Sequence, residues 1–363
     1  MTDWVAPHIK SLPFYVPGKP VEELEEELGI QEAVKLASNE NPLGPSPRAL
    51  AAMEKAMSQV HRYPEGGSVY LRRRLARIHG VDVEQILVGN GSNEILELIA
   101  KTFLRPGEEG IYAEQAFVVY PMIVQSLGGV KVGVPLQDFC HDLEAMADRI
   151  TPNTRLIFIA NPNNPTGTSV GARQMERFLD RVPPRALVVC DEAYFEYVER
   201  PDFPRSLEYL AQGHNLFVLR TFSKIYGLAG MRVGYLVGKR ELVEYVNRVR
   251  EPFNVNSLAQ AAALGALEDT EHVARTLDVN SRGKKFLYAL FGDLGLPFVP
   301  TEANFVLVQV DREKEIYEKL LREGVIVRPM SGWGLPGYLR VSIGLPAENE
   351  RFARALRKIW RGE

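Results

Sequence analysis

Four apolar runs in the first two thirds of the chain each end abruptly in a polar or glycine-rich turn. The runs cover residues 86–88, 156–160, 186–190 and 216–219. Short, continuous apolar runs are typical of strands buried on both faces, as in a mostly parallel sheet covered by helices. Ligands bind beyond the carboxyl ends of such strands, so the four turns are where chemistry is expected.

Lys224 follows the last of these runs, next to Ser223 and ahead of a glycine-rich turn. A lysine between small hydroxyl residues and such a turn suits an amine that forms a Schiff base with a carbonyl compound. A solvated loop lysine is the alternative, and it is the usual interpretation of an isolated lysine. The choice between them depends on the other three turns.

Asp191 comes directly after the run at 186–190, and Glu192 and Tyr194 follow it. A buried carboxylate at this point would keep the pyridine nitrogen of pyridoxal 5′-phosphate protonated, so that the ring can accept electrons from the substrate Cα. The hydroxyl of Tyr194 would reach the 3′-oxygen of the ring. The alternative is that the Asp-Glu pair caps the start of a helix.

The run at 156–160 leads into the turn Asn161-Pro-Asn-Asn-Pro-Thr-Gly167. Pro165 disfavours the helical conformation for Asn164, which leaves the Asn164 amide free to donate to a ring oxygen. The alternative is a loop without a role in binding. Such a loop needs turn-forming residues but does not need them in this order, so it explains the sequence less economically.

The first run is followed by Gly89-Asn-Gly-Ser-Asn-Glu94 and by apolar residues at helical spacing. The free amides of Ser92 and Asn93 would point outward at the positive end of that helix, where a phosphate is stabilised. The turn lacks the third glycine of the dinucleotide-binding motif, and Gly238-Lys239 lacks the rest of a P-loop.

These segments together resemble the fold-type I pyridoxal-phosphate aminotransferases and, within them, the histidinol-phosphate aminotransferase branch. The resemblance covers nearly the whole chain. Other segments that carry it are Leu36–Pro45, Arg62–Glu65, Phe117–Tyr120, Asn254–Asn256, Gly324–Arg328 and Leu339–Gly344. The branch is indicated by Tyr15–Pro20 and Asn39–Pro42.

The expected fold is α/β, with a large domain that has a mostly parallel sheet and a smaller α+β domain. We expect an N-terminal arm at 1–44 that packs with the small domain, a cofactor-binding domain at 45–256 and the small domain at 257–363. In the last of these the pattern predicts strands at 304–310, 325–328 and 339–343 and a helix at 313–323.

The resemblance implies a role for each residue of the cofactor site. Lys224 forms the Schiff base and moves the proton at the substrate Cα, while Asp191, Tyr194 and Asn164 hold the ring. Residues implied to hold the phosphate are Ser92, Asn93, Thr221, Ser223 and Arg232. Phe117 would stack on the ring face, although an ordinary core aromatic is the alternative. Many relatives carry tyrosine at the Phe117 position and aspartate at the Asn93 position, but stacking needs only an aromatic ring and the helix start only its amide.

The resemblance also implies a substrate site. Arg340 would bind a carboxylate, and Arg328 a second anionic group. Histidinol phosphate has no carboxylate, so its phosphate would share this site with the carboxylates of glutamate, because a guanidinium matches both anions. Tyr15 and Asn39 are assigned to the same pocket. For Arg340 an exposed structural salt bridge is the alternative.

Tyr63 lies far upstream of the other assigned residues. The resemblance implies a homodimer in which its hydroxyl donates to the cofactor phosphate of the neighbouring subunit. The alternative is a tyrosine that anchors its own loop.

Composition excludes some partners. The 363 residues carry a net charge of −3, which provides no basic surface for nucleic acid, and no apolar run is long enough to span a bilayer. The start lacks the features of a signal peptide, and two cysteines, Cys140 and Cys190, do not make a disulfide framework, so we expect a cytoplasmic location. We expect no bound metal.

The favoured hypothesis is a pyridoxal-phosphate-dependent aminotransferase that interconverts histidinol phosphate and imidazole acetol phosphate, with glutamate and 2-oxoglutarate as the other pair. An aromatic amino acid aminotransferase or a threonine-phosphate decarboxylase of the same fold is the alternative. A cofactor-sensing regulator is disfavoured, since no helix-turn-helix segment or basic arm precedes the large domain.

Overall fold

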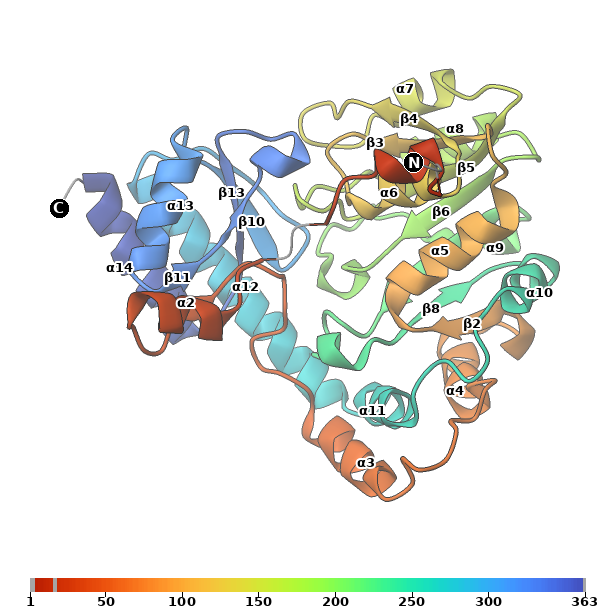
Figure 1. Ribbon diagram of the computed structural model, residues 1–363, viewed down its shortest axis with the longest axis horizontal. Coiled ribbons are helices and arrows are strands. Elements are labelled where there is room, and N and C mark those ends of the chain that lie inside the picture. The colour runs from red at the N-terminus through yellow and green to blue at the C-terminus, as the bar shows by residue number, and fades with distance from the viewer. Residues whose placement is uncertain (1–3, 16–17, 362–363) are drawn as a thin grey trace.

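The computed structural model describes residues 4–15 and 18–361, in two layered parts joined by a long helix (Figure 1). Val16 and Pro17, within the expected motif at 15–20, lie outside the described residues. No helix in the described ranges is both long and apolar enough to cross a membrane.

The larger part is built on a seven-stranded sheet with the order β2-β8-β7-β6-β5-β3-β4. Only β8 runs opposite to the other strands of this sheet, so the prediction of a mostly parallel sheet is confirmed. The strands are β2 (Ile86–Gly89), β3 (Glu109–Ala113), β4 (Val130–Val134), β5 (Thr154–Ala160), β6 (Leu187–Asp191), β7 (Leu216–Thr221) and β8 (Gly234–Val237).

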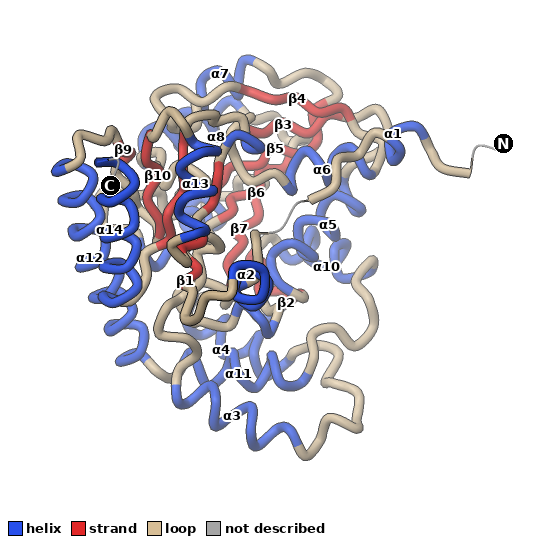
Figure 2. Tube along the Cα trace, turned by 60° about the vertical axis from the view of Figure 1, so that its left-hand side comes forward, coloured by secondary structure: helices blue, strands red, loops and turns tan. Residues whose placement is uncertain are grey.

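Helices cover both faces of this sheet, which explains the unbroken apolar runs (Figure 2). Along β6, Leu187 and Val189 join one core with α5, α6 and α10, while Val188 and Cys190 join the core on the opposite face. The helices of this part are α3 (Pro47–Met57), α4 (Val69–His79), α5 (Gly91–Phe103), α6 (Val119–Ser126), α7 (Leu143–Asp148), α8 (Ala172–Arg181), α9 (Ser206–Ala211), α10 (Arg240–Arg248) and α11 (Ser257–Leu267). Short 3₁₀ turns are η1 (Val83–Gln85), η2 (Phe195–Tyr197) and η3 (Ala229–Met231).

The smaller part has a four-stranded antiparallel sheet with the order β12-β13-β10-β9. Its elements are α12 (Thr270–Asp293), β9 (Phe298–Val299), β10 (Phe305–Gln309), α13 (Glu313–Arg322), β12 (Arg328–Pro329), η4 (Ser331–Trp333), β13 (Tyr338–Ser342) and α14 (Pro346–Arg361). The expected strand at 325–328 is wrong as a single element. Its first half is β11 (Val325–Ile326), which pairs with β1 (Val34–Lys35) instead.

The N-terminal arm contacts both parts. Helix α2 (Val21–Leu28) and β1 pack on the smaller part, where Leu24 and Ala37 share a core with Ile326. Helix α1 (Pro7–Lys10) instead lies on α6, where Gln125 Nε2 donates to His8 O at 2.9 Å (Figures 1 and 2). The arm therefore packs with the smaller part through α2 and β1 and with the larger part through α1.

Candidate active site

A cavity of about 310 Å³ opens at the carboxyl ends of β5, β6 and β7, facing the smaller part. Every residue assigned to the site from the sequence lines it except Tyr63. These residues are Tyr15, Asn39, Ser92, Asn93, Phe117, Asn164, Asp191, Tyr194, Thr221, Ser223, Lys224, Arg232, Arg328 and Arg340. Residues of the cavity wall that received no role from the sequence include Ser38, Glu40, Tyr120 and Trp333.

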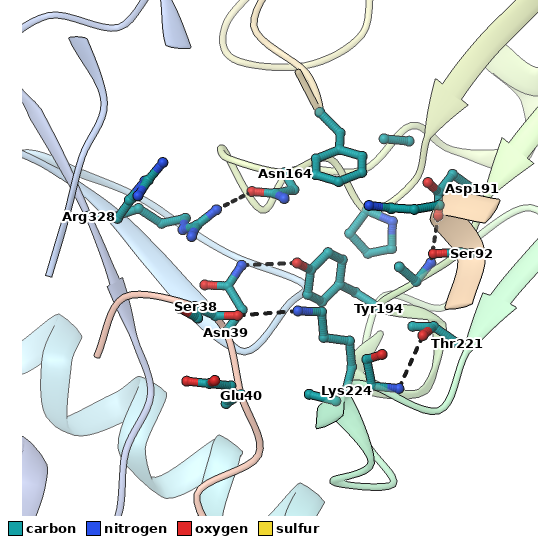
Figure 3. A pocket seen from close by; sticks show the side chains of 18 of the residues that line it. Ser38, Asn39, Glu40, Ser92, Asn164, Asp191, Tyr194, Thr221, Lys224 and Arg328 are labelled. Atoms are coloured by element: carbon teal, nitrogen blue, oxygen red, sulfur yellow. Dashed lines mark hydrogen bonds between the residues drawn. The ribbon is translucent and has the colours of Figure 1, made fainter. Parts of the chain in front are cut away.

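Lys224 lies in the loop between β7 and η3, and its amine points across the cavity (Figure 3). Lys224 Nζ donates to Ser38 O at 3.3 Å and lies 5.5 Å from the centre of the Tyr194 ring. The side chain is therefore tethered inside the cavity and is not a solvated loop lysine.

Asp191 ends β6 and is buried beneath the cavity. Its Oδ2 accepts from the hydroxyl of Tyr120 at 2.8 Å, and its Oδ1 accepts from Ala193 N at 3.3 Å. Burial raises the pKa of Asp191 to about 6, and the hydrogen bond from Tyr120 opposes that rise. A cation placed against this carboxylate would relieve the cost of burying its charge.

The helix-cap alternative for Asp191 and Glu192 is wrong. The next helical turn, η2, begins after Tyr194. Glu192 instead points to the other face of the sheet, where it accepts two hydrogen bonds from Arg220 at 2.8 and 3.0 Å.

The start of α5 and Arg232 form a cradle made possible by two glycines. Gly91 has φ +81°, and a Cβ there would lie 2.6 Å from Arg232 Nη2. A Cβ on Gly234 would lie 2.8 Å from the backbone nitrogen of Ser92. The absence of both side chains lets the guanidinium and the positive end of the helix converge, as binding of a phosphate requires.

Two hydroxyl residues complete this cradle. Thr221 ends β7 and lies near Lys224 (Figure 3), and its Oγ1 accepts from Ser223 N at 3.1 Å. Both hydroxyl residues line the cavity.

Asn39 connects the two parts of the molecule. It is buried with φ +54°, and its Nδ2 donates to the hydroxyl of Tyr194 at 2.9 Å. Ser342 on β13 accepts from Asn39 N at 2.9 Å and donates to Asn39 Oδ1 at 3.0 Å. The orientation of the Tyr194 hydroxyl is therefore set from the smaller part.

Arg340 and Arg328 form the end of the cavity that belongs to the smaller part. They are directly paired across β13 and β12. Arg340 is buried and donates to Ala37 O at 2.7 Å and to Asn164 Oδ1, so an exposed salt bridge is wrong. Burial, with Arg328 as a further cause, lowers the pKa of Arg340 to about 10. Two neighbouring guanidiniums favour an anion between them.

Aromatic side chains form the wall between the two ends. Phe117 packs edge-on against Tyr120, with ring centres 5.7 Å apart, and lies 6.3 Å from Trp333. Phe117 is only partly buried and faces the cavity, so it does more than fill the core. Tyr15 is half exposed at the rim.

Tyr63 stands apart from this cavity. Its side chain is 81% exposed, and its ring stacks on Phe253 with centres 4.6 Å apart. Met57 and Val60, just before it, are also exposed. The structure thus places Tyr63 on an apolar surface of its own chain.

The cavity combines the groups that pyridoxal 5′-phosphate requires. A cradle for a phosphate, a buried carboxylate, a primary amine and an aromatic ring all line it. The residues present therefore fit this cofactor. Among the described residues, no group of three or more His, Cys, Asp or Glu side chains could hold a metal ion.

Comparison with known proteins agrees with this geometry. The sequence matches the aminotransferase class I and II family over residues 31–356. It is 52% identical to a histidinol-phosphate aminotransferase of Moorella thermoacetica, across 97% of this chain and 92% of the relative. It is 51% identical to histidinol-phosphate aminotransferase 2 of Pseudomonas aeruginosa, across 99% of both.

Solved structures show the same similarity. The histidinol-phosphate aminotransferase of Sinorhizobium meliloti, crystallised with pyridoxal 5′-phosphate, superposes with a TM-score of 0.90 at 29% identity, over 100% of this chain and 99% of that one. A single mutant of the aspartate aminotransferase of Thermus thermophilus gives a TM-score of 0.84 at 25% identity, over 98% of this chain and 99% of that one. The chain belongs to the class I and II aminotransferases, a pyridoxal-phosphate-dependent family of fold type I.

Proposed function

We propose that this chain transfers an amino group from L-histidinol phosphate to 2-oxoglutarate, giving imidazole acetol phosphate and L-glutamate in the biosynthesis of histidine. The observation that carries the proposal is the cross-strand pair Arg328 and Arg340 at the far end of a cavity that also holds Lys224. Two adjacent guanidiniums suit a phosphate with two charges better than a single carboxylate. The names of the relatives support the same substrate.

The assigned cofactor residues divide into two groups. Ser92, Asn93, Thr221, Ser223 and Arg232 would hold the phosphate of pyridoxal 5′-phosphate. Asp191, Tyr194, Asn164 and Phe117 would hold its ring. When bound, the cofactor supplies an electron sink for the substrate Cα.

Lys224 would then act as the base. Its amine, already directed into the cavity by Ser38 O, would take the proton from the Cα of the amino donor. In the second half-reaction the same amine would deliver a proton to the Cα of the acceptor skeleton, which becomes glutamate. Asp191 would stay ionised against the protonated ring nitrogen, and Tyr120 would hold the carboxylate in place.

The end of the cavity that holds Arg328 and Arg340 must accept both a phosphate and a carboxylate. Arg340 would bind the carboxylate of glutamate or the phosphate of histidinol phosphate, and Arg328 would add the second contact that a phosphate needs. Tyr15 and Asn39 would complete this pocket.

The experiment that tests the proposal profiles three amino donors with the wild type and with Arg328→Ala. The wild type is expected to prefer histidinol phosphate to phenylalanine and threonine phosphate. The variant should raise KM for histidinol phosphate by about tenfold or more, and KM for phenylalanine by much less, because a lone carboxylate can use Arg340 alone. Steady-state kinetics for each donor provide the measurement.

Other outcomes of this profile have clear meanings. Equal losses for both donors would show that Arg328 only maintains the shape of the pocket. Release of carbon dioxide from threonine phosphate by the wild type would identify the decarboxylase alternative.

We also propose a homodimer in which Tyr63 reaches the site of the neighbouring subunit. Its high exposure and its position outside its own cavity support this arrangement. Mixing chains that carry Lys224→Ala with chains that carry an impairing replacement of Tyr63 should restore activity. Each hybrid then contains one site with an intact Lys224 and the partner's intact tyrosine.

The measurement is the activity of hybrids separated by two affinity tags. Hybrids that stay as inactive as both parents would show that Tyr63 acts within its own chain, and the shared site would be ruled out.

We further propose the division into an arm at 1–44, a large domain at 45–256 and a small domain at 257–363. Separate apolar cores in the two parts support this division except at α11, because Ala259, Ala262 and Ala263 belong to a core of the larger part. The boundary between the two domains therefore falls after α11 and not before it. The cytoplasmic location is proposed because Cys140 and Cys190 are free thiols, which a reducing compartment preserves.

A further inference from the structure

The segment that carries Tyr63 is connected to the phosphate cradle of its own chain by a chain of hydrogen bonds. Arg250, just after α10, is the centre of this chain. Its Nη2 donates to Gly66 O at 2.6 Å, and its Nη1 donates to Asn254 O at 2.8 Å and also to Asn254 Oδ1. Its Nε donates to Asn247 Oδ1 at 3.0 Å. One guanidinium therefore joins the backbone at Gly66 and at Asn254 to the side chain of Asn247 on α10.

The chain continues from Asn254 to the start of α5. Asn254 Nδ2 donates to Glu94 Oε2 at 2.5 Å, and the same oxygen accepts from Asn90 N at 2.6 Å. Asn90 is the residue before α5, and Glu94 directly follows Asn93. The first turn of the helix assigned to the phosphate is thus fixed to Arg250 through a single side chain.

The other end of the chain fixes the Tyr63 segment. Gly66 lies three residues after Tyr63, and Phe253, which stacks on Tyr63, lies between Arg250 and Asn254. A second bond, from Gln260 Nε2 to Glu65 O at 3.1 Å, holds the same segment against the start of α11. The backbone around Tyr63 is therefore held firmly, although the side chain itself is exposed.

We propose that Arg250 is a positioning residue: it holds the Tyr63 segment at a fixed place relative to the start of α5, and so sets how tightly the enzyme binds the phosphate of its cofactor. This inference rests on the proposed dimer, in which the segment serves the neighbouring site. The consequence is that the guanidinium acts on the cofactor phosphate through the tyrosine that it positions for the neighbouring site.

The contacts of Arg250 depend on the planar shape of the arginine head group. Its donors point in fixed directions toward Gly66, Asn254 and Asn247, whereas the single ammonium of a lysine cannot reach all three. Arg250→Lys therefore keeps the positive charge but removes the donors that point in fixed directions. Arg248→Lys, at the last residue of α10, is the matched control, since Arg248 is exposed, donates to Glu244 and lies over the Tyr245 ring of its own helix.

The test is a double-mutant cycle on the dissociation constant of pyridoxal 5′-phosphate, measured by titration of the cofactor-free protein. Arg250→Lys should raise this constant about tenfold, as the loss of a charged hydrogen bond does. Arg248→Lys should leave it unchanged. In the Tyr63→Phe background, Arg250→Lys should raise the dissociation constant by less than a further twofold, because the tyrosine contact is already gone.

Each other result would overturn the inference. If the two substitutions raise the dissociation constant by independent factors, Arg250 acts apart from Tyr63. A normal constant for Arg250→Lys beside a weakened Tyr63→Phe would refute the positioning role and leave the shared site intact. A normal constant for Tyr63→Phe would refute the shared site itself. If Arg250→Lys does not fold, judged by circular dichroism, Asn254→Ala breaks the same chain and must show the same dependence on Tyr63.

Discussion

Lys224→Ala is expected to lower turnover by at least about a thousandfold, because it removes both the amine that forms the Schiff base and the base that moves the Cα proton. Purified protein should also lose the visible absorbance of the lysine-bound cofactor. Stopped-flow kinetics and an absorbance spectrum provide the two measurements.

The fold should survive this change. Among the residues that the structure describes, the Lys224 amine donates one hydrogen bond, of 3.3 Å, to Ser38 O, so circular dichroism and the melting temperature should stay near those of the wild type. Lys101→Ala, at an exposed lysine on α5, is the control for purification and assay. Substantial turnover by Lys224→Ala without an added amine would refute the assignment.

Asp191→Asn is expected to lower kcat by at least about a hundredfold, because a neutral amide cannot keep the ring nitrogen of the cofactor protonated. The cofactor-free variant should nevertheless be more stable than the cofactor-free wild type at pH 8. Burial costs the ionised carboxylate free energy that the amide does not pay.

The sign of the pH dependence follows from the raised pKa. Asp191 titrates at about 6 in the folded chain, above the value of about 4 for an unfolded aspartate. Between these values the folded state holds a proton that the unfolded state has released, so stability falls as the pH rises through this window. The melting temperatures of variant and wild type should therefore agree near pH 4 and diverge above pH 6. Equal melting temperatures at pH 8 would show that Asp191 is buried without cost. Asp180→Asn, at an exposed position on α8, is the control.

The grouping of site residues at the strand ends was predictable from the sequence, because a parallel sheet brings the carboxyl ends of its strands to one edge. Asp191, Asn164 and Lys224 are far apart in the chain, yet each follows an apolar run, and this is enough to expect them in one place. The cradle was predictable for a similar reason, since a glycine turn before a helical pattern has a known geometry.

Contacts between distant segments were not predictable in this way. The hydrogen bond from Tyr120 to Asp191 depends on how α6 rotates against β6. The division of residues 325–328 between two sheets depends on β1, which lies almost 300 residues earlier. Local periodicity contains no information on either contact. Arg340 and Arg328 were assigned through the resemblance alone, because a strand pattern does not distinguish a buried arginine from an exposed one.

The hydrogen bond between Arg340 and Asn164 couples the part of the cavity assigned to the substrate anion to the part assigned to the cofactor ring. Asn164 Oδ1 accepts from Arg340, while the remaining amide group of Asn164 is the one assigned to the ring oxygen. An anion that draws the guanidinium toward itself competes for that bond and changes how Asn164 is held. Linkage then requires reciprocity: whatever factor a substrate anion imposes on the affinity for the cofactor, the cofactor imposes on the affinity for that anion. Phosphate and carboxylate donors engage the arginine pair differently, so the enzyme should hold its cofactor with a strength that depends on which of its two amino donors is bound.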